Sequence, residues 1–268
     1  MTHAGKRNVL GVLVDAIDYD TATDIIIRAA RQRRALAVTA LAVHGVMTGV
    51  QNPEHQGRLN TFDLVTPDGQ PVRWALNWLY GSQLDDRVYG PELTMRVLQR
   101  CAGEGLGVFL YGSTSETLDR LSVSLERKLP SLDIVGTEPS KYRLARPGEA
   151  EDIAQQVSDS GAHVVLVGLG CPRQEEFTHA MRPLVNAPLL AVGAAFDYHS
   201  GGLKIPPPWV QARGLEWLWR LWLEPRRLWR RYLLLNPAYS IRLLAQGLRL
   251  WRPEMPKASD HRTHAFPI

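Results

Sequence analysis

Cysteine is scarce in this 268-residue chain, and its two cysteines, Cys101 and Cys171, lie far apart in the sequence. That spacing provides neither a disulfide framework nor a zinc-ligand pattern, which favours a reducing compartment. No apolar run reaches the roughly 18 residues of a membrane span, and Asp15 interrupts the N-terminal stretch before it resembles a signal peptide. The sequence predicts a cytosolic protein that meets a membrane only at its surface.

Motifs for metals and nucleotides are also missing. The histidines form no ligand cluster, and the spaced acidic residues Asp15, Asp18 and Asp20 lie away from the expected ligand site. We therefore expect no metal. Neither G-x-G-x-x-G nor G-x-x-x-x-G-K-[ST] occurs, so neither a dinucleotide fingerprint nor a P-loop is supported.

Charge is distributed unevenly, although the net charge is only +4. Between residues 213 and 252, nine arginines against two glutamates give a net charge of +7, so the rest of the chain carries −3. Six of the eight tryptophans lie between residues 209 and 251. A mildly acidic body therefore carries a basic, tryptophan-rich appendage, most concentrated in EPRRLWRRYLLL at 224–235.

Short β-branched runs alternate with helical patterns over the first 200 residues. Strands are predicted at 7–14, 35–39, 62–66, 107–112, 132–136, 163–170 and 188–193. Helices are predicted at 21–34, 70–80, 91–105, 115–128, 147–161 and from about 172. This alternation predicts an α/β fold with a Rossmann-like, mostly parallel sheet, helices on both faces and a C-terminal helical amphipathic appendage. We assign 1–203 to a catalytic body, 204–252 to the appendage and 253–268 to a flexible tail.

Polar residues and glycines follow several predicted strands, where ligands bind in parallel sheets. They are Thr39, Asp68, Gly112, Gly168, Gly170 and Asp197. Asp68, in TPDG, is either a β-turn residue or a general base at the rim of a pocket. Arg87 is either a solvated charge or part of the site. GLGCPRQEE is either a simple turn or an anion-binding helix start, with Gln174 and Glu175 pointing toward the same rim.

Six stretches together carry a family resemblance. They are TPDGQPVRWAL, RVYGPEL, VFLYGSTSETLDRL, LVGLGCPRQEEF, AVGAAFDYHSG and GLEWLWRLWLEPRRLWRRY. In order and spacing the chain resembles the WecG/TagA/CpsF glycosyltransferases over roughly residues 8 to 250. The resemblance implies an inverting transferase for cell-surface polysaccharide synthesis. It would move a sugar from a UDP-sugar to a polyprenyl-diphosphate-linked saccharide at the cytoplasmic membrane face, with no metal or cofactor.

The resemblance also implies roles for individual residues. Asp68 would be the general base that takes the proton of the acceptor hydroxyl. Arg87 would suit the leaving diphosphate, whose charge grows in the transition state, and Tyr142 and Asp197 would contact the nucleoside. The full set expected to bind substrate is Thr39, Arg87, Gly112, Tyr142, Gln174, Glu175 and Asp197.

Three positions depart from the family pattern. Leu41 replaces the Asn of T-x-N, Glu92 replaces the Asp of G-x-D-L, and Ile205-Pro206-Pro207 replaces RAP. Loss of an amide and an arginine leaves the donor sugar open between N-acetylmannosamine and another sugar, such as the glucose of UDP-glucose in exopolysaccharide synthesis. A non-catalytic scaffold that binds a nucleotide-sugar is a further alternative.

The appendage has the pattern of a membrane-surface helix. Arg226, Arg227, Arg230 and Arg231 fall within about 140° of arc at 100° per residue, and a second helix is predicted after Asn236-Pro237. Basic amphipathic helices with interfacial tryptophans bind anionic membranes.

We expect this region to lie on the inner leaflet, with those four arginines and Arg220 shared between lipid headgroups and the acceptor diphosphate. Alternatives are packing on the body, or a homo-oligomer interface that hides the apolar face. The alternation of arginine with leucine and tryptophan favours lipid over nucleic acid, so we expect no nucleic-acid partner.

Overall fold

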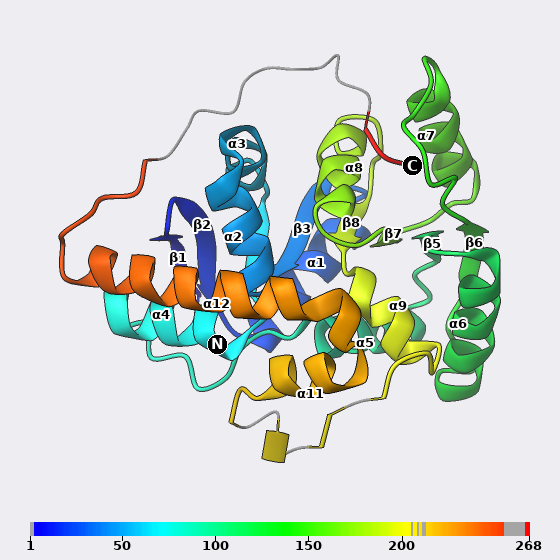
Figure 1. Cartoon of the computed structure of the whole chain (residues 1–268). Helices are drawn as coiled ribbons and strands as arrows, with labels where there is room; N and C mark the ends of the chain where they lie inside the picture. Colours follow the sequence, from blue (N-terminus) through cyan, green and yellow to red (C-terminus); the bar gives the residue numbers. More distant parts are fainter. Residues whose placement is uncertain (1–2, 205, 208, 211–212, 255–265) are drawn as a thin grey trace.

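The body of the protein is built on a six-stranded parallel sheet, seen in a computed structural model (Figure 1). The structure describes residues 3–204, 206–207, 209–210, 213–254 and 266–268, without the side chains of Arg227, Arg230 and Arg231. The sheet order is β4-β3-β8-β7-β5-β6. The strands are β3 (Leu36–Leu41), β4 (Leu64–Pro67), β5 (Val108–Gly112), β6 (Ile134–Glu138), β7 (Val164–Gly168) and β8 (Pro188–Ala191). The predicted Rossmann-like α/β fold is confirmed.

The first predicted strand, 7–14, is wrong. This stretch folds as an antiparallel hairpin of β1 (His3–Val9) and β2 (Val12–Ile17), outside the main sheet. Its two-residue turn places both Leu10 and Gly11 at positive φ, 56° and 93°. Because leucine is rare at positive φ, Leu10 does not indicate a turn, and the apolar run resembles one continuous strand in the sequence. The prediction also missed two helices between β3 and β4, α2 (Val43–Gln51) and α3 (Pro53–Asn60).

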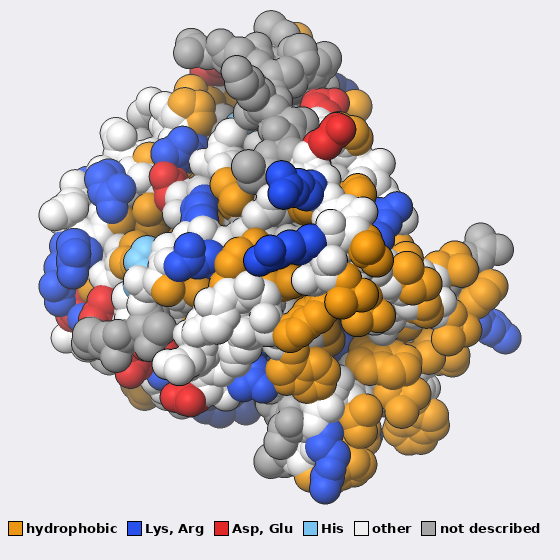
Figure 2. Space-filling model, turned by 90° about the vertical axis from the view of Figure 1, so that its left-hand side faces the viewer, with side chains coloured by type: hydrophobic (Ala, Val, Ile, Leu, Met, Phe, Trp, Pro, Cys, Tyr) orange, Lys and Arg blue, Asp and Glu red, His pale blue; other side chains and the backbone are white. Residues whose placement is uncertain are grey.

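The appendage lies across one side of the body as α11 (Glu216–Leu223) and α12 (Pro225–Gly247) (Figure 1). The predicted break after Asn236 is wrong, because α12 continues through Pro237. Tertiary contacts hold the second half in line: the Tyr239 hydroxyl donates to the Pro71 carbonyl at 3.2 Å, and Gln246 bonds the turn of the hairpin. Figure 2 shows hydrophobic side chains gathered on this side of the molecule, at the lower right of the view.

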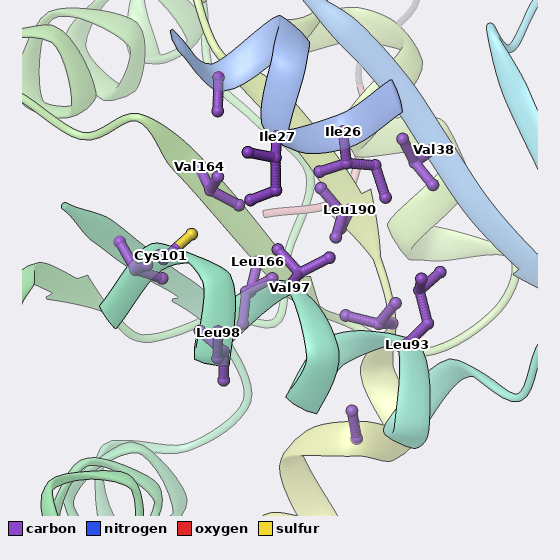
Figure 3. Packing of buried hydrophobic residues seen from close by; sticks show 14 of the residues in the cluster. Ile26, Ile27, Val38, Leu93, Val97, Leu98, Cys101, Val164, Leu166 and Leu190 are labelled. Atoms are coloured by element: carbon purple, nitrogen blue, oxygen red, sulfur yellow. The ribbon is translucent and has the colours of Figure 1, made fainter. Parts of the chain in front are cut away.

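Alternate residues of the strands pack against the two helical layers. On one face, Val108 and Leu110 of β5 meet α1 (Tyr19–Arg31), α5 (Gly90–Glu104), α6 (Ser115–Lys128) and α9 (Gly193–His199). Figure 3 shows part of this layer, with Ile26 and Ile27 of α1 facing Val97 of α5 across the strand residues. The other face is covered by α2, α3, α4 (Gln70–Tyr80), α7 (Glu149–Asp159) and α8 (Arg173–Met181). Burial on both faces explains the nearly continuous apolar strands.

The end of the chain is only partly described. Most of the predicted flexible tail, 255–265, lies outside the described residues. Its last three residues, Phe266–Ile268, pack against the body, with Ile268 fully buried among side chains of β5, β7 and α8. The flexible-tail prediction does not hold for these three residues, because they bury apolar surface that the sequence pattern did not connect to the core.

Candidate active site

A cavity of about 580 Å³ opens at the carboxyl ends of the parallel strands. Loops after β3, β4, β5, β7 and β8 form its walls, and α11 and α12 of the appendage close one side. Of the predicted site residues, those that line it are Asp68, Arg87, Tyr142, Gln174, Glu175, Asp197 and Arg220. Thr39, Gly112 and Arg226 do not line it. This position at the strand ends is where parallel α/β sheets bind ligands.

Asp68 is the first residue after β4 and is held by backbone groups on both sides. Its N–H donates to the Leu41 carbonyl at 3.1 Å, and its Oδ1 accepts from the Gly90 N–H at 3.0 Å. Burial raises the pKa of Asp68 to about 6, although Arg87 and the Gly90 N–H oppose the shift. A half-buried carboxylate on a cavity wall, still ionised near pH 7, has the properties of a general base.

Arg87 lies beside Asp68 and is only 4% exposed. Both of its terminal nitrogens donate to the carboxylate of Glu216, the first residue of α11. Its guanidinium also lies over the Tyr89 ring, 4.4 Å from the centroid. Of the two alternatives for Arg87, the solvated charge is therefore excluded. Its side chain joins the body to the appendage at the cavity.

Both ends of the Gln174 amide are held by contacts within the protein. Its Oε1 accepts from the Gly193 N–H at 2.9 Å, and its Nε2 donates to the Ala191 carbonyl and to Glu175 Oε1. A Cβ on Gly193 would lie 2.5 Å from Gln174 Oε1, so glycine is needed there for this approach. Thr39 also donates to Glu175 Oε1, at 3.0 Å, from a fully buried position. These side chains brace the cavity floor and fix the loop after β8.

The remaining predicted residues are Gly112, Tyr142 and Asp197, of which Tyr142 and Asp197 line the cavity. Gly112 has φ 104°, and a Cβ there would lie 2.9 Å from the Gly168 carbonyl, so its neighbour Ser113 reaches the cavity instead. Tyr142 stands at the rim, 58% exposed, with the Arg173 guanidinium 5.2 Å from its ring centroid. Asp197 lies on the wall formed by α9.

The appendage arginines differ in position. Arg220 lines the cavity from α11, whereas Arg226 is exposed and lies outside it. Arg227, Arg230 and Arg231 belong to α12, but their side chains lie outside what the structure describes.

The three departures from the family pattern differ in their position relative to the cavity. Leu41 lines the cavity, while Glu92 is exposed on α5 and pairs with Arg96 at 2.9 Å. Pro206 and Pro207 are not among the lining residues, and Ile205 lies outside the described part of the chain. Leu41 is therefore the one departure that the described residues place on the cavity wall.

Aromatic and acidic wall residues that were not predicted from the sequence include Tyr89, Tyr198 and Glu216. Tyr89 and Tyr198 meet edge to face with their ring centroids 6.0 Å apart, and Glu216 holds Arg87. Each lies within a quoted motif: RVYG, FDYHSG and GLEWL. Their position inside these motifs was the available signal.

One group of described residues, His55, Cys171 and Glu175, has potential metal-ligand atoms within 4.8 Å of one another. Its chemistry does not fit a cation. Arg58 Nη1 lies 3.2 Å from His55 Nδ1. Because arginine can only donate, Nδ1 accepts from it and the ring proton belongs on Nε2, so neither nitrogen offers a free lone pair to a cation. Burial and the Arg58 charge lower the pKa of His55 to about 4, and the same positive charge opposes a metal ion.

Comparison with known proteins gives a family match and several relatives. The model of the "Glycosyl transferase WecG/TagA/CpsF family" matches residues 7–253. A relative from Bacillus spizizenii, strain ATCC 23059 / NRRL B-14472 / W23, is 30% identical over 204 residues, which is 76% of each chain. It is an N-acetylglucosaminyldiphosphoundecaprenol N-acetyl-beta-D-mannosaminyltransferase.

Proposed function

This chain belongs to the WecG/TagA/CpsF family of glycosyltransferases, and from that premise we propose that it moves a sugar from a UDP-sugar to a polyprenyl-diphosphate-linked saccharide with inversion. The relative from Bacillus spizizenii carries an undecaprenol-linked acceptor in its name, which supports a lipid-linked acceptor here. The observation that carries the mechanism is Asp68, a carboxylate of raised pKa on the cavity wall beside Arg87.

In the proposed reaction, Asp68 accepts the proton of the acceptor hydroxyl. The hydroxyl oxygen forms a bond to the anomeric carbon of the donor, from the face opposite the diphosphate. The bond between that carbon and the diphosphate oxygen breaks, and UDP leaves with the electron pair. This single displacement inverts the anomeric carbon and leaves Asp68 protonated. Since the pKa of Asp68 is about 6, its proton returns to water near neutral pH.

Two arginines on the wall are suited to the charge of the leaving diphosphate. Arg220 is half-buried, and its Nε has no hydrogen-bond partner among the described residues. Arg87 already holds Glu216 through both terminal nitrogens. A diphosphate at Arg87 therefore competes with Glu216 or shares the guanidinium with it, which links donor binding to the placement of α11.

The donor sugar is proposed as either N-acetylmannosamine or another sugar, such as glucose. The wall at the end of β3 is formed by Ala40, Leu41, Ala42 and Val43, so the amide at the second residue after Thr39 in the family pattern is replaced by an apolar side chain. A site that hydrogen-bonds a sugar substituent strongly rejects sugars that lack this substituent. The apolar side chains of this wall offer no such hydrogen bond.

We propose that the appendage rests on an anionic membrane at the cytoplasmic face. Large apolar side chains are exposed along it, among them Trp222 at 73%, Leu234 at 63% and Ile241 at 67% (Figure 2). Trp74 and Trp78 of α4 extend this surface. No helix in the described part of the chain is long and apolar enough to cross a bilayer. Exposed apolar surface with arginines at its edge is suited to lying in a lipid interface.

The test is transfer from a panel of UDP-sugars to GlcNAc-diphospholipid and Glc-diphospholipid acceptors. Asp68→Asn should abolish transfer, and Asp119→Asn, an exposed aspartate on α6, should not. Transfer from UDP-N-acetylmannosamine to the GlcNAc lipid assigns the sugar named for the relative. Transfer only from another donor assigns that sugar. UDP binding without transfer from any donor favours a non-catalytic scaffold.

A further inference from the structure

The segment Phe266–Ile268 adds a short strand-like pairing to the loop between β6 and α7, residues 139–148. The Ala145 N–H donates to the Phe266 carbonyl at 2.8 Å, and the Ile268 N–H donates to the Arg143 carbonyl at 2.9 Å. Leu144 and Pro267 form an antiparallel bridge between them. These backbone bonds fix the register of the segment on the loop.

Side chains of the segment enter the core beneath the same loop. Ile268 is 0% exposed and packs in the cluster that contains Phe109, Tyr111 and Phe177. The Phe266 ring meets Phe177 edge to face at 5.9 Å, and Phe177 stacks on Tyr111 at 4.2 Å. The segment is therefore anchored in the body, not laid over its surface.

Ser140 connects this anchor to the cavity rim. Its hydroxyl donates to the Ile268 carbonyl oxygen at 3.0 Å and accepts from the Tyr142 N–H at 3.1 Å. Arg173 Nη2 donates to the hydroxyl oxygen of Ser140 at 3.2 Å, and the Arg173 guanidinium lies over the Tyr142 ring. One serine thus joins the segment to both the backbone of Tyr142 and its cationic neighbour.

Tyr142 needs such support. Its φ is 52°, a left-handed conformation that a bulky residue adopts only when its surroundings impose it. The other side of the loop is held by Glu149, whose carboxylate binds Arg143 and the Arg146 N–H. Without the segment, the loop would keep the Glu149 contacts but lose those at Ser140, Arg143 and Ala145.

We propose that Phe266–Ile268 is a positioning segment that holds Tyr142 at the cavity rim, with Arg173 against its ring, for the nucleoside diphosphate of the donor. An exposed aromatic face beside a guanidinium is suited to stacking a base near a phosphate group. This inference rests on the proposed UDP-sugar function. The segment lies beyond residue 253, where the match to the family model ends, so the device belongs to this chain and not to the matched family region.

The test uses the full chain with Phe266→Ala and Ile268→Asp combined. The probe is UDP, titrated by calorimetry, together with amide exchange at Ala145 and steady-state kinetics on the donor. If the loop without the segment adopts its UDP-binding conformation only about one-tenth to one-fifth of the time, the apparent Kd for UDP rises about five- to tenfold. KM for the donor should rise with it while kcat stays near the wild-type value, and exchange at Ala145 should accelerate.

Three matched variants keep the test decisive. Val123→Asp places a new charge at an exposed apolar position of α6 and should leave UDP affinity unchanged. Ile268→Val keeps the apolar anchor and should bind UDP with the affinity of the wild type. Ser140→Ala leaves the apolar anchor intact, removes the link to Tyr142 and should weaken UDP binding even if the double variant folds poorly.

The outcomes separate this inference from the proposed function. Equal UDP affinity in the wild type, the double variant and Ser140→Ala overturns the inference alone. If the double variant has a lower unfolding temperature but unchanged UDP affinity, the segment only stabilises the fold. This outcome also overturns the inference. Absence of UDP binding by the wild-type chain overturns the proposed function and this inference together.

Discussion

The sheet body and the appendage are held by different forces. Strands β5 and β7 are buried on both faces within continuous apolar clusters. Helix α11, by contrast, has no fully buried residue. Helix α11 is joined to the body by the Arg87–Glu216 pair, whereas α12 also packs on the body through apolar side chains, among them the buried Tyr239. A polar pair is strong in one geometry and weak once displaced, so we expect α11 to move more readily than the body unfolds.

The largest effect is expected from the body side of the cavity. Asp68→Asn should lower turnover about 10²- to 10⁴-fold, the range for loss of a general base. The fold should not suffer, because the asparagine oxygen can still accept the Gly90 N–H and no charge remains to be desolvated. Initial rates and thermal unfolding of the variant measure both effects. Turnover equal to wild type would contradict the proposed role of Asp68.

The second prediction concerns the Arg87–Glu216 pair, at which the body and the appendage meet. Glu216→Gln removes the carboxylate that both terminal nitrogens of Arg87 bind in a nearly inaccessible position. Breaking a buried pair costs about 3 kcal/mol or more, which is about a hundredfold in the population of the displaced state. Limited proteolysis near residues 203–215 should accelerate accordingly, while unfolding of the body stays unchanged. Glu92→Gln, at an exposed pair with Arg96, is the control and should have little effect. If the body and the appendage instead unfolded in a single cooperative transition, the stated difference between them would be wrong.

The outward face of the appendage provides the third test. Ile241→Asp combined with Leu244→Asp should weaken binding to anionic liposomes at least about thirtyfold, because two exposed apolar side chains no longer enter the interface. Vesicle flotation measures the binding, which should also weaken with salt. Leu184→Asp, an exposed apolar position of the body, is the control. Binding to DNA that rivals binding to liposomes would instead favour a nucleic-acid partner.

The smallest expected effect is a dependence on pH. Because the pKa of Asp68 is raised to about 6, the base is mostly ionised at pH 7 and about tenfold less so at pH 5, and kcat should fall in proportion. The sign for stability is opposite. The folded state holds this proton more tightly than the unfolded state, so the contribution of Asp68 to stability is present at low pH and is lost as pH rises from about 4 through 6. Asp68→Asn should remove that decline in unfolding free energy, which denaturant titrations at several pH values would detect.

The sequence predicted the sheet because its signals are local. Alternating β-branched and helical runs identify strands such as β5 and β7, and parallel topology then brings Asp68, Arg87 and Gln174 to one rim. The misses depend on partners distant in the chain. Nothing near Glu216 indicates that it holds Arg87, 129 residues away. Pro237 signals a helix break by itself, and contacts of α12 with the body, such as those of Tyr239 and Gln246, favour a continuous helix. The Leu10–Gly11 turn has glycine at one of the two positions that need it, too weak a signal to split the apolar run.

The bond between the hairpin and α12 also has a consequence for synthesis of the protein. The Leu10 N–H donates to Gln246 Oε1 at 2.9 Å, and Gln246 Nε2 donates to the Asn8 carbonyl. These residues are 236 and 238 positions apart. At about 5–20 residues per second, a ribosome needs on the order of ten to fifty seconds to cover that distance. The Leu10 N–H therefore waits for 236 further residues before it gains this partner, whereas the Leu10 and Gly11 carbonyls bond Gln56 and Asn60, which are made much earlier.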